Sequence, residues 1–151
     1  MLTLPQKAIS EGFNYLIAVG GDGTLNEMIN GVINSFKTEN SYDWQKISEI
    51  KIGVYPAGSG NDFARNIEDS SLKKLKQNII NHQSEMVDVG FARFFDEKEE
   101  STERFFINIT DVGIGGELVI MKEKMQRYFS PKFNYMASIL YVMATFKKNT
   151  V

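Results

Sequence analysis

The chain has 151 residues, of which 42% are hydrophobic and 24% charged, so it is long enough for one good core or one and a half small domains. Its formal net charge of −2 leaves no broad basic surface, and we expect no nucleic-acid partner. Because it contains no cysteine, disulfides, thiolate nucleophiles and thiolate metal sites are excluded.

The first residues predict a helix, a strand and a second helix in succession. Residues 5–11 are expected to form the last turns of a helix that Gly12 closes, and the apolar run 15–19 is typical of a strand. We expect the following helix to open at Leu25, with Thr24 and Glu27 as its capping box. Its inward face is indicated by apolar residues at helical spacing, namely Leu25, Met28, Ile29, Val32 and Phe36.

A glycine-rich turn, Gly20-Gly21-Asp22-Gly23-Thr24, lies between this strand and helix. Three glycines in four positions let the backbone adopt positive φ and approach a ligand, and the amides at a helix start carry partial positive charge. A phosphate-bearing ligand is the natural occupant of such a turn. The alternative is a tight turn that uses glycine and aspartate for conformational reasons only.

A second turn of the same kind, Pro56–Arg65, follows the strand expected at residues 50–55, and residues 37–46 are expected to form an exposed connection before it. Ser59 with Asp62 resembles a helix start. In a parallel sheet both turns would lie at the carboxyl ends of their strands, where open α/β sheets bind ligands. We therefore expect the two turns to form the walls of one cleft.

The region after the second turn predicts an amphipathic helix and then a hairpin. The helix is expected to direct some residues inward, namely Leu72, Leu75, Ile79 and Ile80, and others outward, namely Lys73, Lys74 and Lys76. Residues 86–95 and 104–110 are aromatic and β-branched, which predicts antiparallel strands joined by the acidic turn 96–103. We interpret this charged turn as a solvated hairpin tip.

Two further helices are expected in the last third of the chain. Residues 111–116 lead into a helix that ends near Tyr128, and Ser130 with Pro131 starts another that reaches about Lys148. The second helix has an apolar face made of Phe133, Met136, Ala137, Leu140, Tyr141 and Ala144. Core packing is the favoured interpretation of this face, with docking on lipid or lining of an acyl-chain groove as the alternative.

Three motifs, in this order, resemble the diacylglycerol kinase catalytic-domain family, which includes bacterial lipid kinases and the sphingosine and ceramide kinases. The first is Gly20–Thr24 with Asn26 and Glu27, the second is Pro56–Arg65, and the third is Val87–Gly90. The resemblance runs from about residue 8 to the end of the chain.

The resemblance implies an α/β fold. A parallel-sheet nucleotide-binding domain of the Rossmann-like, NAD kinase or lipid kinase type would occupy residues 1–89, and an antiparallel β-rich second domain would begin in residues 90–151. The family's N-terminal strand with its Asn-Pro turn and the distal region that supplies the catalytic base have no counterpart here. We therefore expect an incomplete fragment in which no catalytic residue can be assigned.

For the site, the resemblance implies ATP and Mg²⁺ as cofactors. The expected nucleotide-binding residues are Gly20, Gly21, Asp22, Gly23, Thr24, Gly58, Ser59, Gly60, Asn61 and Asp62. The resemblance also places Asp22, Asp62 and Asp88 in a metal and water network. A carboxylate beside phosphates points to a cation independently, because like charges repel. Each carboxylate also has a structural interpretation. Asp22 would only accept hydrogen bonds from amides of its own turn, and Asp62 would only be a first-turn residue favoured by the helix dipole. Asp88 lies in an apolar run and needs a partner if it is buried.

Other polar residues have two interpretations each. Asn61 can orient a phosphate or cap a turn, and Arg65 can reach a phosphate or form a surface ion pair. Glu27 is assigned to capping before ligand contact. His82, the only histidine, is expected in solvent, and Ser59 has no His and Asp partners at the spacing of a nucleophilic triad.

The expected function is ATP-dependent phosphorylation of a lipid hydroxyl, such as that of diacylglycerol, at a membrane surface. An NAD kinase-like phosphotransferase is the first rival, and a nucleotide- or lipid-binding module without catalysis is the second. We find no signal peptide, and residues 133–146 are too short an apolar stretch to span a bilayer. We therefore expect a cytoplasmic protein that can also associate peripherally with the inner face of the membrane. Self-association through surface uncovered by truncation is also expected.

Overall fold

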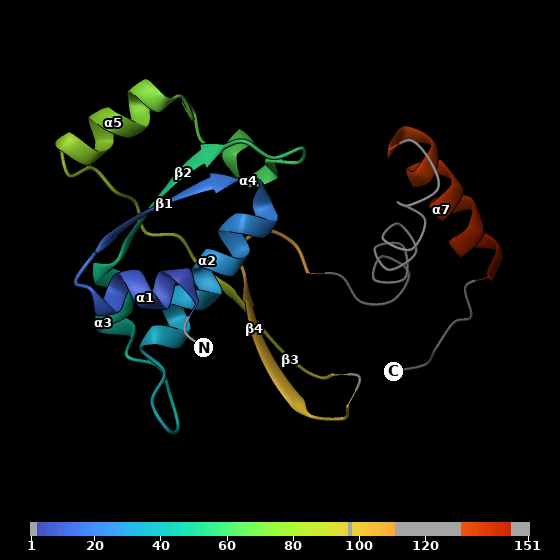
Figure 1. The fold of residues 1–151 in the computed structure, drawn as a ribbon, viewed down its shortest axis with the longest axis horizontal. Helices are drawn as coiled ribbons and strands as arrows, with labels where there is room; N and C mark the ends of the chain where they lie inside the picture. Colours follow the sequence, from blue (N-terminus) through green and yellow to red (C-terminus); the bar gives the residue numbers. More distant parts are fainter. Residues whose placement is uncertain (1–2, 97, 111–130, 146–151) are drawn as a thin grey trace. The chain divides into compact units, whose positions relative to one another are not determined.

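The computed structural model describes residues 3–96, 98–110 and 131–145 (Figure 1). The chain divides into two compact units, Met1–Asn108 and Ile109–Val151. The helix expected to end near Tyr128 falls outside the described residues. Within these residues the structure is α/β, with one parallel and one antiparallel pair of strands.

The parallel pair consists of β1 (Tyr15–Gly20) and β2 (Lys51–Pro56). Tyr15 lies opposite Lys51, and the register continues to Gly20 opposite Pro56, so both strands end at the same edge. Leu16 and Ala18 of β1 are buried while the residues between them are exposed, which is the alternation of a strand with one covered face. The predicted parallel pairing is therefore confirmed.

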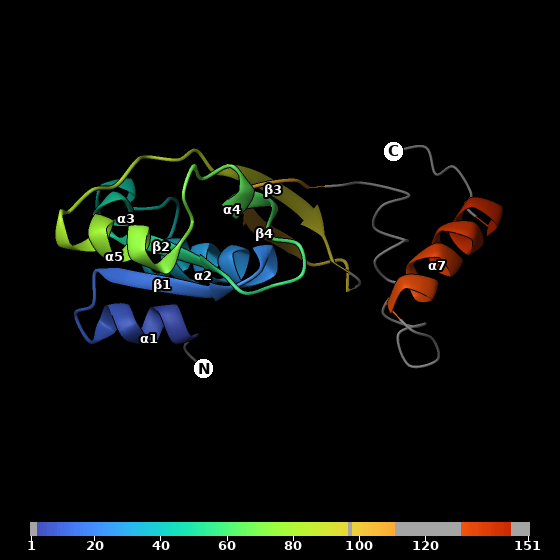
Figure 2. The same ribbon diagram turned by 90° about the horizontal axis from the view of Figure 1, so that it is seen from above.

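Helix α2 (Asp22–Ser35) covers the buried face of β1. Leu25, Ile29 and Ile33 form a core cluster with Ala18 and Phe105. Both views show α2 between the parallel pair and the β3–β4 hairpin (Figures 1 and 2). Of the predicted inward residues, Val32 is also buried, whereas Met28 and Phe36 are half-buried.

The expected start of this helix was wrong. The helix begins at Asp22 rather than Leu25, because the Gly21 carbonyl already accepts the Leu25 amide at 3.2 Å. Gly21 is the N-cap, so Thr24 lies inside the first turn and cannot form the predicted capping box with Glu27. The Glu27 carboxylate instead accepts a hydrogen bond from Arg104 of the hairpin.

Four short helices surround this core. Helix α1 (Leu4–Ser10) is capped by Thr3 with Gln6, and Gly12 follows it with a φ of +90°. Helix α3 (Trp44–Glu49) begins within the expected connection because the Asp43 carboxylate accepts the Lys46 amide at 3.1 Å. Helix α4 (Asp62–Arg65) follows the second turn.

Helix α5 (Leu72–Ile80) rests on β2 through one residue. Leu75 is buried, and it lies over Gly53, where a Cβ would come within 2.8 Å of it. Leu72 and Ile80 were expected to point inward but are 62% and 63% exposed, because so short a helix touches the sheet only near its middle.

The hairpin consists of β3 (Gly90–Phe95) and β4 (Ser101–Phe106), paired antiparallel from Gly90 opposite Phe106 to Phe95 opposite Ser101. The predicted hairpin is confirmed, but its strands are displaced from the expected ranges. Residues 86–89 and 107–110 lie outside the strands, and β4 starts three residues early. The Asp96 carboxylate accepts the Lys98 and Glu100 amides, which tightens the turn and lengthens the β4 pairing.

A buried amide joins the hairpin to α2. Asn30 is 3% exposed; its Nδ2 donates to the Phe105 carbonyl at 2.7 Å, and its Oδ1 accepts the Phe105 amide at 2.9 Å. The Phe105 ring packs against Tyr42, Trp44 and Phe91. The hairpin thus belongs to the unit Met1–Asn108. The domain division between residues 89 and 90 stays a prediction about the intact protein.

A charged cluster joins the hairpin to the segment that follows α2. The Glu103 carboxylate accepts from Arg93 Nη2 at 2.7 Å, from the Tyr42 hydroxyl at 2.9 Å and from Lys37 Nζ at 3.1 Å. These donors lower the pKa of the Glu103 carboxyl to about 2, and the hydrogen bond from Arg93 has the largest effect.

Helix α7 (Pro131–Thr145) belongs to the second unit and confirms the helix expected to begin at Pro131. Val142 is buried, but Met136, Leu140 and Tyr141 are exposed, so the described part of this face is not packed into a core. Self-association through such an uncovered apolar surface stays a prediction. Among the described helices, none is long and apolar enough to cross a membrane.

The Asn30 contact predicts a stability loss on truncation. Asn30→Ala leaves the Phe105 N–H and C=O without partners, so we expect the free energy of unfolding in urea to fall by roughly 1–3 kcal/mol. Asn34→Ala, at an exposed position of the same helix, is the control and is expected to change stability far less. Equal stabilities of the two variants would contradict the clamping role of Asn30.

The Glu103 cluster predicts a pH dependence. Because the folded pKa is depressed from 4.5 to about 2, the contribution of Glu103 is fully present above pH 4.5 and is lost as the pH falls towards 2. The stability difference between the wild type and Glu103→Gln should therefore be largest near neutral pH and shrink over this window. Thermal unfolding at several pH values measures it, with the exposed Glu49→Gln as control. A difference independent of pH would rule out the ionic role.

Candidate functional site

The two glycine-rich turns touch each other at the carboxyl edge of the parallel pair. The Ala57 amide donates to the Gly20 carbonyl at 3.0 Å. A Cβ added to Gly58 would lie 2.4 Å from the Cα of Gly21, so only glycine permits this approach. The expectation that the turns are neighbours agrees with this geometry.

The Asp22 carboxylate bridges the turns. Its Oδ2 accepts the Asp62 amide at 2.9 Å, and its Oδ1 accepts the Phe63 amide at 2.9 Å. The same Oδ1 accepts the Asn108 side-chain amide at 2.8 Å. These donors lower the pKa of the Asp22 carboxyl, and the Phe63 amide has the largest effect, so the carboxylate stays ionised. Asp22 therefore satisfies two amides of the other turn.

Asn61 closes the second turn. Its φ of +61° is left-handed, a conformation that asparagine tolerates better than most residues. Its Oδ1 accepts the Gly58 amide at 3.1 Å, and its Nδ2 donates to the Gly58 carbonyl at 2.5 Å. Of the two interpretations of Asn61, the turn-closing one describes its contacts here.

The remaining predicted site residues lie at the surface. The Asp62 carboxylate forms an ion pair with Arg65 at 2.6 Å, so Arg65 adopts the surface pairing that was one of its two interpretations. Asp88 is exposed and takes no part in the contacts around Asp22. His82 is exposed, as expected.

The carboxylates do not assemble a metal site by themselves. Within residues 3–96, 98–110 and 131–145, no three Asp, Glu or His side chains come close enough together to hold a metal ion. Both oxygens of Asp22 already accept N–H donors. A protein-built Mg²⁺ site does not fit this arrangement, and the network of Asp22, Asp62 and Asp88 stays a prediction.

We expected the two turns to form the walls of one cleft. The structure shows no open cleft between them. Because Gly21 and Gly58 lack side chains, their backbones meet, and the cavity enclosed beside them is only ≈ 10 Å³. That volume is about enough for one water molecule. A phosphate group therefore has no room between the turns.

The outer surface of the turns remains accessible. Its exposed residues are Gly23, Thr24, Ser59 and Gly60. In the described part of the chain, the backbone amides of these four residues have no hydrogen-bond acceptor. Gly23 and Thr24 lie in the first turn of α2, where the helix carries its partial positive charge. An anion can bind on this outer side.

One residue of the site was missed by sequence reasoning. Asn108 follows β4 by two residues and reaches Asp22, which lies 86 positions earlier in the chain. An asparagine between Ile107 and Ile109 is a weak sequence signal, because nothing local shows what its amide contacts.

Comparisons with known proteins agree with this geometry. The family model described as "Diacylglycerol kinase catalytic domain" matches residues 2–92. Curated relatives named "Diacylglycerol kinase" from Staphylococcus aureus strains JH9, Newman and USA300 are each 33% identical over 114 residues. The match covers 75% of this chain but only 29% of each relative. No solved structure matches.

The contact between the turns predicts a difference between two glycine substitutions. Gly58→Ala places a methyl group against the Gly21 backbone, so we expect a loss of roughly 1–3 kcal/mol in unfolding free energy by overpacking. Gly23→Ala is the matched control, because a Cβ there meets nothing within 4 Å and alanine favours a helix. Urea denaturation of both variants tests this expectation, and equal effects would refute it.

Proposed function

Because the chain belongs to the diacylglycerol kinase catalytic-domain family, we propose that it forms part of an ATP-dependent kinase that phosphorylates a lipid hydroxyl such as that of diacylglycerol. The match covers under a third of the length of the curated relatives, so this activity is proposed for the whole protein and not for this chain alone. The observation that carries the proposal is the bridge by which Asp22 joins two glycine-rich turns from separate strands.

The proposed role of the turns is to bind the nucleotide phosphates. Phosphoryl transfer needs chiefly positioning and stabilisation of negative charge on the transferring group. The amides of Gly23, Thr24, Ser59 and Gly60 would bind phosphate oxygens on the outer surface. Gly20, Gly21, Gly58 and Asn61 would shape that surface.

The hydrogen-bond donors of the turns support an anionic ligand. The Asp22 carboxylate lies against the first turns of both α2 and α4 and balances the partial positive charge of these helix ends, so the phosphates would be held by hydrogen bonds from the free amides. Mg²⁺ bound with the nucleotide would supply further positive charge to the phosphates. Asp22, Asp62 and Asp88 remain the proposed metal and water network, which would hold Mg²⁺ through the nucleotide and water while Asp22 keeps its bonds to the Asp62 and Phe63 amides.

The parallel pair, the position of both turns and the family membership also support a Rossmann-like sheet in the intact protein. The proposed lipid acceptor would be met at a membrane surface. No residue of this chain is proposed as the catalytic base.

The proposal is tested by phosphate transfer in the full-length protein that contains this chain. With Mg²⁺ and ATP labelled in the γ-phosphate, we expect label in a diacylglycerol acceptor and none in NAD. Asp22→Asn should lower transfer at least about tenfold, a loss of about 1.4 kcal/mol of transition-state stabilisation, because one amide would then face an N–H donor.

Asp43→Asn is the matched control, because Asp43 also accepts a backbone amide but lies at the start of α3. It should keep the wild-type transfer rate. Transfer to NAD instead of lipid would favour the NAD kinase-like rival. Thermal stabilisation by ATP without transfer to any lipid hydroxyl would overturn the kinase proposal in favour of a binding module.

A further inference from the structure

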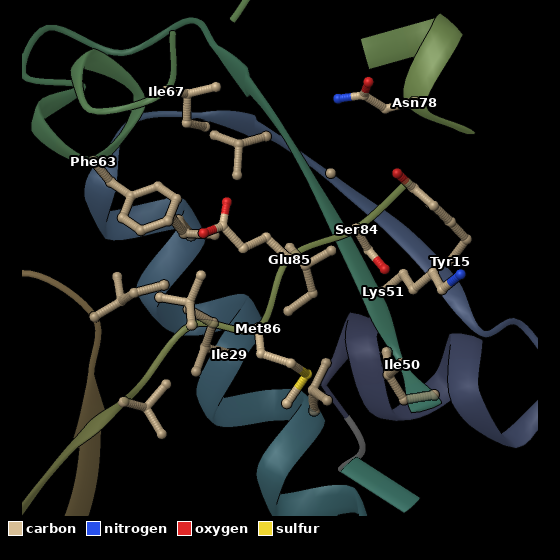
Figure 3. A pocket seen from close by; sticks show the side chains of 18 of the residues that line it. Tyr15, Ile29, Ile50, Lys51, Phe63, Ile67, Asn78, Ser84, Glu85 and Met86 are labelled. Atoms are coloured by element: carbon tan, nitrogen blue, oxygen red, sulfur yellow. The ribbon is translucent and has the colours of Figure 1, made fainter. Parts of the chain in front are cut away.

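A much larger cavity lies beside the free edge of β2 in the unit Met1–Asn108 (Figure 3). Its volume is ≈ 500 Å³. Side chains of α2, α3 and β2 line most of it, together with the extended segment 83–89. The apolar contributors include Ile29, Val32, Ile47, Ile52, Val54 and Phe63. It is separate from the outer surface of the glycine-rich turns.

The size of the cavity restricts its ligand. Small-molecule sites commonly measure about 300–1,000 Å³ and are mostly apolar with a few polar groups. A single alkyl chain fits into ≈ 500 Å³, whereas a lipid with two long acyl chains is larger than this space. The cavity therefore favours a ligand with one chain.

The polar groups of the lining are separated. Figure 3 shows Tyr15, Lys51 and Asn78 on one side of the cavity and Glu85 with Phe63 on the other. In the described part of the chain, Lys51 forms no ion pair and the Tyr15 hydroxyl forms no hydrogen bond. An anionic headgroup is attracted to the Lys51 side and repelled by the carboxylates of Glu85 and Asp69, which also line the cavity.

Two details agree with a headgroup at that side. Burial raises the pKa of the Tyr15 hydroxyl, which therefore remains a hydrogen-bond donor. The Asn78 Oδ1 is buried and has no hydrogen-bond partner within the described residues. With the amide assigned the other way round, its Nδ2 would place an N–H donor at this position.

We propose that this cavity binds one long-chain carboxylate, with the carboxylate at Lys51 and Tyr15 on the α5 face of the parallel pair. The alkyl chain would pass round the edge of β2 to Ile29, Val54 and Phe63 on the α2 face. This inference goes beyond the proposed function, because the ligand is a single-chain acid and not the lipid alcohol that would be phosphorylated. Binding needs neither nucleotide nor turnover.

The chain carries its own reporter of this binding. Trp44 is the only tryptophan in the sequence, and it lines the cavity. A long-chain fatty acid with bromine in the middle of its chain quenches tryptophan only at short range. Titrated below its micelle concentration into this chain, it should quench Trp44 emission saturably. The unbrominated acid should reverse the quenching.

The headgroup and the chain are tested separately. Lys51→Gln should weaken binding at least about fivefold, whereas Lys73→Gln, an exposed lysine of α5 outside the lining, should not. Ile47→Phe, which fills part of the cavity, should also weaken binding, and circular dichroism checks that each variant is folded. Affinity for a series of acids should rise by up to about fourfold for each added methylene.

Several outcomes would overturn the inference. These are absence of quenching, quenching that does not saturate, equal affinity for the straight-chain alcohol of the same length, or equal affinity of the wild type and a folded Lys51→Gln variant. Because the assay contains no ATP, its failure would leave the kinase proposal intact. Failure of lipid phosphorylation would likewise leave this binding result intact.

Discussion

The arrangement of the site depends on a single carboxylate that accepts three hydrogen bonds from two segments distant from it in sequence. Asp22 stands in the first turn of α2, yet its donors are the amides at the start of α4 and the side chain of Asn108 after the hairpin. Its charge also favours the positive ends of both helices. One anionic group thus fixes the two strand-to-helix turns in a common position.

Side-chain bonds to the backbone hold both a local turn and a contact between elements distant in sequence. Asn61 closes the second turn on Gly58, and Asn30 pairs with both backbone groups of Phe105 in β4. Apolar contacts alone would leave these buried backbone groups without partners, which is unfavourable. The bonds therefore specify how the elements align, while the cluster around Ala18 and Ile33 supplies the apolar burial.

The unit Met1–Asn108 presents two chemically different regions. The outer surface of the turns has amides without acceptors in the described chain and the positive start of a 14-residue helix, which suits an anion. The cavity beside β2 is apolar, with a lysine on one side. Because the turns close against each other through Gly21 and Gly58, a phosphate ligand would be kept on the outside, away from the apolar interior.

Sequence patterns predicted the parallel pairing of β1 with β2, the hairpin and the family, because these follow from local periodicity and from motifs. Helix α3 was missed, since the polar residues before β2 predicted only an exposed connection. The start of α2, the closed contact between the turns and the partners of Asp22 were decided by the tertiary structure. Asn108 lies 86 residues from Asp22 along the chain, and Phe105 lies 75 from Asn30. No local pattern encodes such contacts, since they exist only once packing of the hairpin on α2 has brought the segments together.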